Sequence, residues 1–280
     1  MDAIVFLAVL LAAAFHAGWN AMVKIDLDRF LSITLISLAA GTVAVAALPF
    51  VAVPRESAWP WLAVSALLHT GYKIFLVQAY RAGDLGQVYP IARGAAPLLV
   101  WLAMLATGEV LTAHAIAGIA LLVGGVWLMS VRGGRDLAKL EGRAVTYALG
   151  TSVFIASYTV TDGLGARING DAHGYAVWLF VLDGLLMLAL LLLMRGRCGL
   201  AAMRPFIVSG LAGGAMSLGA YWIVIWAATV APIAMVAALR ESSVLFAGAI
   251  SVLILREPPT RWRLLSALVI VVGMALMRAR

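Results

Sequence analysis

The chain has 280 residues and a formal net charge of +7, with 64% hydrophobic and only 12% charged residues. A soluble domain carries about a quarter charged residues, so this composition excludes an ordinary soluble protein and predicts a multi-pass membrane protein. The basic residues stand in short segments between apolar runs, which is typical of membrane topology signals and argues against a nucleic-acid-binding protein. The single cysteine, Cys198, excludes a disulfide framework and a cysteine-based metal site.

Apolar runs long enough to cross a bilayer follow one another along the chain, since a spanning helix needs about 20 mostly apolar residues. The N-terminal run has no basic segment before it and is too long for a signal peptide, so we interpret it as the first span. A charge-dense segment, 132–143, divides the spans into two sets of five, in residues 1–131 and 144–280. The ten expected spans lie near residues 3–23, 30–53, 59–81, 85–107, 112–131, 144–163, 173–194, 205–228, 231–254 and 262–277.

The two sets share one repeat frame. When Gln78–Met129 is moved by 148 residues onto Trp226–Met277, Glu109 meets Glu257 and Gly125 meets Gly273 without a gap. Because five is an odd number, the second set must start on the opposite side of the membrane from the first. The sequence therefore predicts an all-α integral membrane protein of two inverted five-helix repeats, an architecture typical of secondary transporters with a substrate site at the midplane.

The distribution of lysine and arginine predicts the orientation of the chain. Connections after odd-numbered spans carry 13 of these residues, and the opposite side carries four. The positive-inside rule then places the odd connections in the cytoplasm and both termini outside it. We expect a monomer in the inner (plasma) membrane whose partners are the lipid bilayer and a small-molecule substrate, with no cofactor, no metal and no nucleic acid.

A glutamate closes the fourth span of each set and a Gly-rich fifth span follows it, which resembles the EamA repeat of the drug/metabolite transporter superfamily. The proline inside the fourth span, Pro97, is a second feature that resembles this repeat, although Leu245 stands at the equivalent position of the second set. The resemblance implies export or exchange of small metabolites, often amino acids, through a central cavity lined mainly by spans 1, 3, 4, 6, 8 and 9. YddG-type amino-acid exporters are similar in size and layout.

Charged residues inside the spans are the first functional candidates, because each costs at least about 2.5–3.5 kcal/mol in hydrocarbon. Lys73 either faces a cavity or extends its amine to the membrane surface. Arg93 either binds a substrate carboxylate or bonds the backbone carbonyls that Pro97 leaves free. The repeat frame puts Arg93 opposite Glu241, so we expect an ion pair between them that acts as a gate, a substrate site or a structural lock.

Three further ionisable residues have different expected roles. His16 either satisfies a hydrogen bond in the core or takes part in proton coupling. Asp162 lies near the end of the expected sixth span, and we expect it to be solvated. Asp183 is in the middle of the seventh span, where it should pair internally or stay protonated.

Aromatic residues complete the expected site. Trp101, Tyr221 and Trp222 lie deep in their spans and predict an apolar wall opposite the charged residues Lys73 and Arg93. Such a cavity suits a zwitterion with an apolar side chain, whose carboxylate the two cations would attract. The expected substrate-binding residues are Trp19, Asn20, Tyr72, Lys73, Gln78, Tyr89, Arg93, Trp101, Tyr158, Tyr221, Trp222, Arg240 and Glu241.

The sequence thus favours a permease that exports or exchanges amino acids by alternating access. Other small organic metabolites or drugs are alternative substrates. An enzyme is disfavoured because no HExxH or GxSxG motif is present, and the chain lacks the phosphate-binding loop of an ATP-driven pump. A non-transporting assembly protein is a further alternative, but it would have no use for buried Lys73, Arg93 and Arg240-Glu241.

Overall fold

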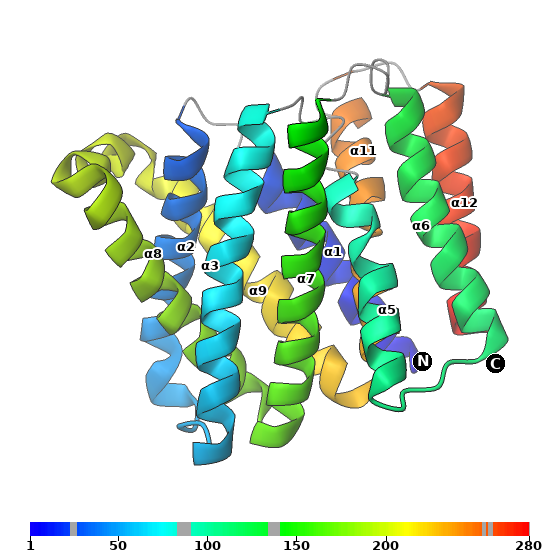
Figure 1. Cartoon of the computed structure of the whole chain (residues 1–280), viewed down its shortest axis with the longest axis horizontal. Helices are drawn as coiled ribbons and strands as arrows, with labels where there is room; N and C mark the ends of the chain where they lie inside the picture. Colours follow the sequence, from blue (N-terminus) through cyan, green and yellow to red (C-terminus); the bar gives the residue numbers. More distant parts are fainter. Residues whose placement is uncertain (23–26, 83–90, 134–140, 254–255, 257–259, 280) are drawn as a thin grey trace.

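The structure is a computed structural model that describes residues 1–22, 27–82, 91–133, 141–253, 256 and 260–279. All regular elements in these residues are helical, as the sequence predicts. Short 3-10 turns at Leu48–Phe50, Glu56–Ala58 and Arg204–Phe206 lie beside the longer helices. The α-helices labelled or coloured in Figure 1 are α1 (Ala3–Met22), α2 (Arg29–Ala47), α3 (Trp59–Ala82), α5 (Ala96–Ala106), α6 (Ala113–Gly133), α7 (Gly142–Asn169), α8 (Ala172–Met203), α9 (Ile207–Val230), α10 (Ile233–Arg240), α11 (Ser243–Leu253) and α12 (Arg261–Arg278).

Six helical stretches within the described residues are long and apolar enough to cross a membrane. One of them, Ala172–Val230, has 59 residues and contains both α8 and α9. Shorter apolar helices occupy Ile91–Ala106 and Ala113–Met129. Helices suit a bilayer because they satisfy their backbone hydrogen bonds internally. The chain is therefore a multi-pass α-helical membrane protein, whereas the count of ten spans and their inverted relation stay predictions.

Local sequence signals explain where several helices begin and end. The Asp28 carboxylate accepts a hydrogen bond from the Phe30 backbone N–H at the start of α2, at 2.7 Å. Asp171 caps α8 in the same way, through the backbone N–H groups of His173 and Gly174. Gly170 ends α7 with φ +74°, a left-handed conformation that glycine adopts without strain. These caps supply partners for backbone groups that a helix end leaves unpaired.

Two helical segments are interrupted at related points of the repeat frame. Pro97 stands in the first turn of α5, where the missing backbone N–H costs no helical hydrogen bond, and a bend at Ala95 precedes it. The second interruption has no proline and lies at Glu241 and Ser242, between α10 and α11. Moving Ala95 by 148 residues gives Ser243, the first residue of α11. The two breaks thus lie close to equivalent positions of the repeat frame, although only the first has a proline.

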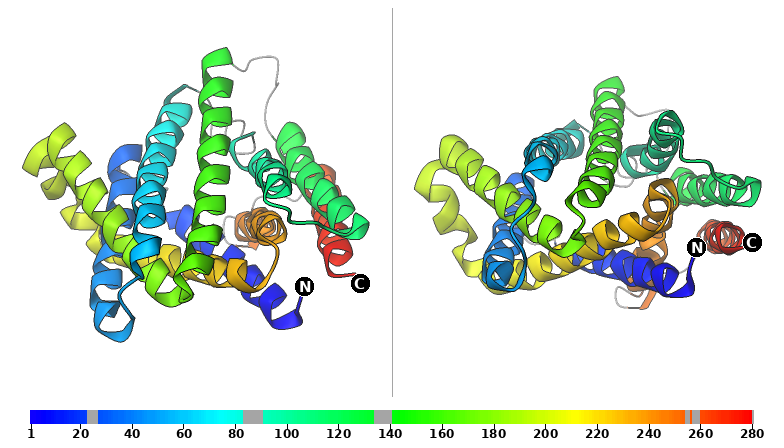
Figure 2. Two further views of the ribbon diagram at one scale, coloured as in Figure 1. Left: turned by 60° about the horizontal axis from the view of Figure 1, so that its bottom comes forward. Right: turned by 90° about the horizontal axis from the view of Figure 1, so that it is seen from below.

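Glycine residues allow close contacts between helices of the bundle. Gly41 of α2 lies against Gly184 of α8, where a methyl group added to Gly41 would be 3.1 Å from the Gly184 Cα. Small residues let helix backbones approach in this way in membranes. Helices α6 and α12 lie side by side at one edge of the molecule and α8 forms the opposite edge (Figures 1 and 2). Helices α1, α2, α3, α7 and α9 lie between these edges.

Candidate functional site

A cavity of about 690 Å³ lies inside the bundle, a volume typical of pockets for small organic ligands. Its walls come from the second half of α1, the first half of α2, the second half of α3 and parts of α7 to α11. Apolar side chains such as Ile36 and Phe180 provide much of the lining. Its polar and aromatic lining side chains are His16, Trp19, Asn20, Arg29, Ser37, His69, Tyr72, Lys73, Tyr80, Tyr158, Asp183, Ser217, Tyr221, Arg240, Ser243 and Ser251.

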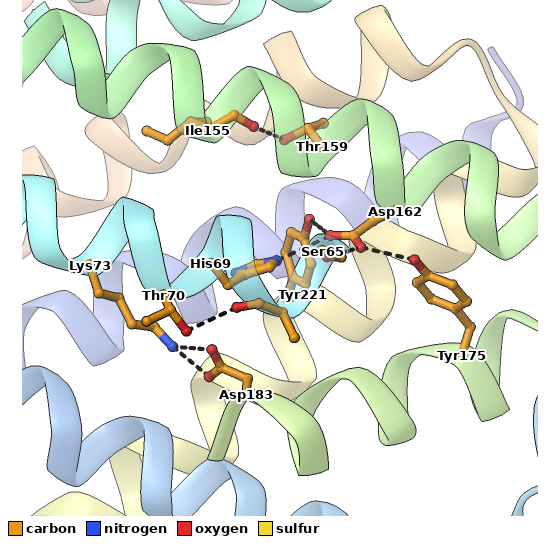
Figure 3. A network of polar contacts seen from close by, with 11 residues as sticks. Ser65, His69, Thr70, Lys73, Ile155, Thr159, Asp162, Tyr175, Asp183 and Tyr221 are labelled. Atoms are coloured by element: carbon orange, nitrogen blue, oxygen red, sulfur yellow. Dashed lines mark hydrogen bonds and ion pairs between the residues drawn. The ribbon is translucent and has the colours of Figure 1, made fainter. Parts of the chain in front are cut away.

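Lys73 of α3 and Asp183 of α8 form a buried ion pair on the cavity wall. The Lys73 Nζ donates to both carboxylate oxygens of Asp183 at 2.5 Å, as Figure 3 shows. The lysine therefore does not extend to the membrane surface, and the internal pairing expected of Asp183 is confirmed. Because the two charges neutralise each other, Lys73 contributes no net charge to the cavity.

Arg93 and Glu241 form the ion pair that the repeat frame predicts. The Arg93 Nε donates to Glu241 Oε2 at 2.9 Å, and the exposed fractions of the two residues are 2% and 1%. Their residue numbers differ by 148, which is the offset of the repeat frame, so the two residues occupy equivalent positions in that frame. The pair lies beside the cavity without lining it. This geometry favours the structural lock among the expected roles.

Arg240 is the second arginine at this carboxylate, and it does line the cavity. Its Nε is 3.8 Å from Glu241 Oε1, which is too long for a hydrogen bond. Its guanidinium carbon lies 5.9 Å from the ring centroids of both Tyr158 and Tyr221, within the range of a cation–π contact. Arg240 is 3% exposed, and its Nε has no hydrogen-bond partner among the described residues.

A second carboxylate, Asp162 of α7, connects four helices at one end of the cavity (Figure 3). One carboxylate oxygen accepts hydrogen bonds from the hydroxyls of Ser65 and of Tyr175, the latter at 3.2 Å. The other oxygen is 2.6 Å from the Tyr221 hydroxyl and 3.1 Å from His69 Nε2. An ionised carboxylate has about four acceptor sites, so this arrangement fills them.

The expectation that Asp162 is solvated was wrong. The residue is 1% exposed and is among the most thoroughly hydrogen-bonded side chains of the described bundle. The error came from the helix boundary, because α7 continues to Asn169 while the expected span ended near residue 163. Asp162 is thus about two turns from the helix end. The cost of a carboxylate inside a span, the signal that singled out Lys73, would have identified it.

The structure brings seven of the expected site residues together around the cavity, and places the others elsewhere. Trp222 lines a separate small pocket, where its Nε1 donates to His173 Nδ1 at 2.8 Å. Trp101 packs against the apolar core, and Gln78 is half-buried outside the cavity. Arg93 and Glu241 lie beside the cavity, and Tyr89 is outside the described residues. The seven lining residues are Trp19, Asn20, Tyr72, Lys73, Tyr158, Tyr221 and Arg240.

Several lining residues were absent from the expected site. His69 stacks on Tyr158, with ring centroids 4.0 Å apart, and contacts Asp162 through its Nε2. Its helical spacing to Lys73 on α3 was the available signal. Ser37 and Ser217 also line the cavity, but a serine in a long apolar run gives no comparable signal because its hydroxyl can bond its own helix backbone.

Among the described residues, no three histidine, cysteine or carboxylate side chains come together as a metal site would require. His16 has a local partner, because the Trp19 Nε1 donates to its Nδ1 at 3.2 Å. This contact occupies one ring nitrogen of a residue that also lines the cavity, and both roles expected of His16 stay predictions. The cavity therefore offers hydrogen-bonding groups, aromatic rings and the two arginines Arg29 and Arg240, which is chemistry suited to binding a small molecule.

Fold and site together define a multi-pass α-helical membrane protein with an internal cavity whose largely apolar wall carries buried polar and charged groups. Residues 142–279 match the model of the EamA-like transporter family, which supports the EamA resemblance and indicates a membrane transporter of small molecules. No curated protein sequence matches the chain significantly. A solved chain described as "Crystal structure of protein" superposes with a TM-score of 0.78 at 17% identity, over 98% of this chain and 95% of its own, and has the same fold.

Proposed function

We propose that this protein is a secondary transporter that exports or exchanges small metabolites, with amino acids as the first candidates, by alternating access. The observation that carries the proposal is the cavity of about 690 Å³, which places buried charged and aromatic groups inside a membrane-spanning bundle. Such groups are costly in hydrocarbon and are retained where a substrate or ion passes. The EamA-like match over residues 142–279 supports the same reading.

The proposed architecture is ten spans in two inverted repeats, and the contacts between α6 and α12 support it. A methyl added to Gly118 would lie 2.6 Å from the Gly273 carbonyl oxygen, and one added to Gly125 would lie 3.1 Å from the Ser266 carbonyl oxygen. In the repeat frame, Gly118 is equivalent to Ser266 and Gly125 is equivalent to Gly273. The Gly118–Gly273 contact is therefore equivalent to the Gly125–Ser266 contact. Two elements related by a two-fold axis are expected to make such reciprocal contacts.

The Arg93–Glu241 pair is a further argument for this axis, because residues at equivalent positions meet where the axis passes. The proposed substrate site then lies at the repeat interface, beside two interrupted helices, as in other inverted-repeat transporters. Alternating access would open the cavity first to one side of the membrane and then to the other. The lock between Arg93 and Glu241 would hold the two repeats together at the centre during this motion.

The lining residues of the cavity suggest which end is open. They include Asn20 near the end of α1, Arg29 at the start of α2 and Tyr80 near the end of α3. The connections next to these helix ends are the Lys- and Arg-rich ones, so we propose that the cavity opens to the cytoplasm. The Asp162 cluster would close the opposite end, where Trp222 lines its separate pocket.

Flux measurements with purified protein in liposomes test the function. A panel of labelled amino acids, other organic metabolites and drugs should reveal uptake or exchange above protein-free vesicles. Ala220→Trp would fill the cavity and should abolish this flux, since Ala220 is a buried lining residue. Leu193→Trp is the matched control, because Leu193 is 85% exposed on the outer surface. Absence of flux for the whole panel, or full activity of Ala220→Trp, would reject the proposal in favour of an assembly protein.

Fusions to alkaline phosphatase test the proposed sidedness. An enzyme fused to the C-terminus should be active outside the cytoplasm, whereas the same enzyme fused within segment 132–143 should be inactive. The reverse result would show that the cavity of this structure opens away from the cytoplasm.

A further inference from the structure

We propose that the cavity binds a carboxylate of its substrate at Arg240, with the Ser243 hydroxyl as a second donor. This inference rests on the proposed function, in which the cavity holds the transported molecule. It differs from the sequence-based expectation, which gave the carboxylate to Lys73 and Arg93. The named substrate class is a monocarboxylate with an apolar body, whether or not it also carries an amine.

The charge balance at the interrupted helix is the first argument. Two guanidinium groups, Arg93 and Arg240, meet a single carboxylate, Glu241, and all three are at most 3% exposed. This trio keeps one net positive charge, and only Arg240 of the three lines the cavity. Among the described residues, Arg240 makes no hydrogen bond to a carboxylate, and a buried charge that lacks such a partner is strongly destabilising in a low-dielectric interior. An anion in the cavity would compensate it.

The other cations of the cavity are less suited to this task. Lys73 is neutralised by both oxygens of Asp183 at 2.5 Å, so a substrate would have to displace a bonded partner. Arg29 is only half-buried at the start of α2, where its guanidinium lies 5.9 Å from the Tyr80 ring. Water competes with a ligand more effectively at such a position. Arg240 is therefore the best-placed cation for a desolvated contact with an anion.

The hydrogen-bonding groups around Arg240 are the second argument. Buried polar atoms in proteins nearly always have a partner, and those that lack one call for an explanation. Among the described residues, the Arg240 Nε and the Ser243 Oγ are both buried without a hydrogen-bond partner, and both residues line the cavity. Ser243 is the first residue of α11, directly after the break that separates it from Arg240. A ligand carboxylate at this wall would supply the acceptors that the two donors lack within the described residues.

The composition of the site favours a carboxylate over a phosphate. One guanidinium can donate two parallel hydrogen bonds to the two oxygens of a carboxylate. A phosphate dianion would need more than the single net positive charge that the trio supplies. The Tyr158 and Tyr221 rings beside the guanidinium and apolar residues such as Phe180 give room for an apolar body next to the carboxylate.

The test uses four probes that share a phenyl body: phenylalanine, 3-phenylpropionate, phenethylamine and phenyl phosphate. We expect the purified wild-type protein to bind and transport phenylpropionate, and to discriminate against phenethylamine and phenyl phosphate. Arg240→Gln should weaken phenylpropionate binding about tenfold to a hundredfold, the range expected for a hydrogen bond to a charged group. Arg197→Gln is the matched control, which removes an exposed arginine that does not line the cavity and should retain phenylpropionate binding.

A measurement on the wild-type protein covers the case in which Arg240→Gln fails to fold. An arginine-specific dicarbonyl reagent, followed by mass spectrometry, should modify Arg240 more slowly when phenylpropionate is bound, with the exposed Arg197 outside the cavity as the internal reference. The inference would be overturned if Arg240 were modified at the same rate with and without the two carboxylate probes, phenylalanine and phenylpropionate. Equal transport of phenethylamine and phenylpropionate would also overturn it. So would tighter binding of phenyl phosphate than of phenylpropionate. Transport of phenylpropionate without phenylalanine would leave the inference standing and reject amino acids as the substrate.

Discussion

Asp162 and Glu241 are both buried carboxylates of the helix bundle, yet their surroundings differ. Asp162 receives four side-chain contacts, two on each oxygen, from helices α3, α8 and α9. Glu241 binds Arg93 through one oxygen, while its Oε1 has no hydrogen-bond partner among the described residues. The first arrangement is complete without a ligand and holds helices together. The second keeps donors and one positive charge beside the cavity, as a binding site requires.

The largest expected effect comes from breaking the complete cluster. Asp162→Ala would leave four groups on three helices without their acceptor, and since each buried donor left unsatisfied costs about 1–3 kcal/mol, we expect a loss of stability of at least about 3 kcal/mol. The yield of monodisperse protein and its melting temperature in detergent measure this loss. Glu56→Ala, which removes an exposed carboxylate, is the control and should behave like the wild type. A stable Asp162→Ala protein would contradict the role assigned to the cluster.

Removal of Glu241 should have the next largest effect. Glu241→Leu leaves Arg93 and Arg240 as adjacent buried cations, and we expect a destabilisation of about 3 kcal/mol. Adding Arg93→Met should restore part of the stability, because it removes one of the two uncompensated charges. A double-mutant cycle on melting temperature and flux measures the coupling. Additive losses in the cycle would contradict a direct structural pair.

The hydroxyl donors to Asp162 should give smaller and graded effects. Tyr221→Phe removes the 2.6 Å contact and Tyr175→Phe removes the 3.2 Å contact. Hydrogen bonds between membrane helices contribute about 0.6 kcal/mol on average and up to about 1.7 kcal/mol, so we expect Tyr221→Phe to cost more within this range. Thermal unfolding of the two variants in the same detergent compares them. An equal or reversed order would show that the shorter bond is not the stronger one.

Trp222→Phe is expected to have the smallest effect. It removes the hydrogen bond to His173, which should cost about 0.6 kcal/mol, and one ring of the indole at a half-buried position outside the cavity. Substrate flux in liposomes should stay at the wild-type level. A strong loss of flux would restore the sequence-based expectation that Trp222 forms part of the substrate wall.

Much of the helical architecture and part of the site were accessible from the sequence alone. Helix α8, for example, spans Ala172–Met203 where a span was expected near 173–194, because a long apolar run has one low-energy solution in a bilayer. The repeat frame also predicted the Arg93–Glu241 pair, since equivalent positions meet near a two-fold axis. Tyr72 and Lys73, two of the expected substrate-binding residues, both line the cavity.

The tertiary structure decided which partner each buried charge has. Asp162 depends on Tyr175 and Tyr221, and Lys73 depends on Asp183, 110 residues away. No local pattern encodes such contacts, because they follow from how helices rotate and cross. Hydropathy and the repeat frame depend on composition and spacing, so the sequence by itself determined the membrane class. The saturation of Asp162, and the Arg240 Nε that lacks a hydrogen-bond partner among the described residues, depend on distances of a few ångströms between helices, which only packing determines.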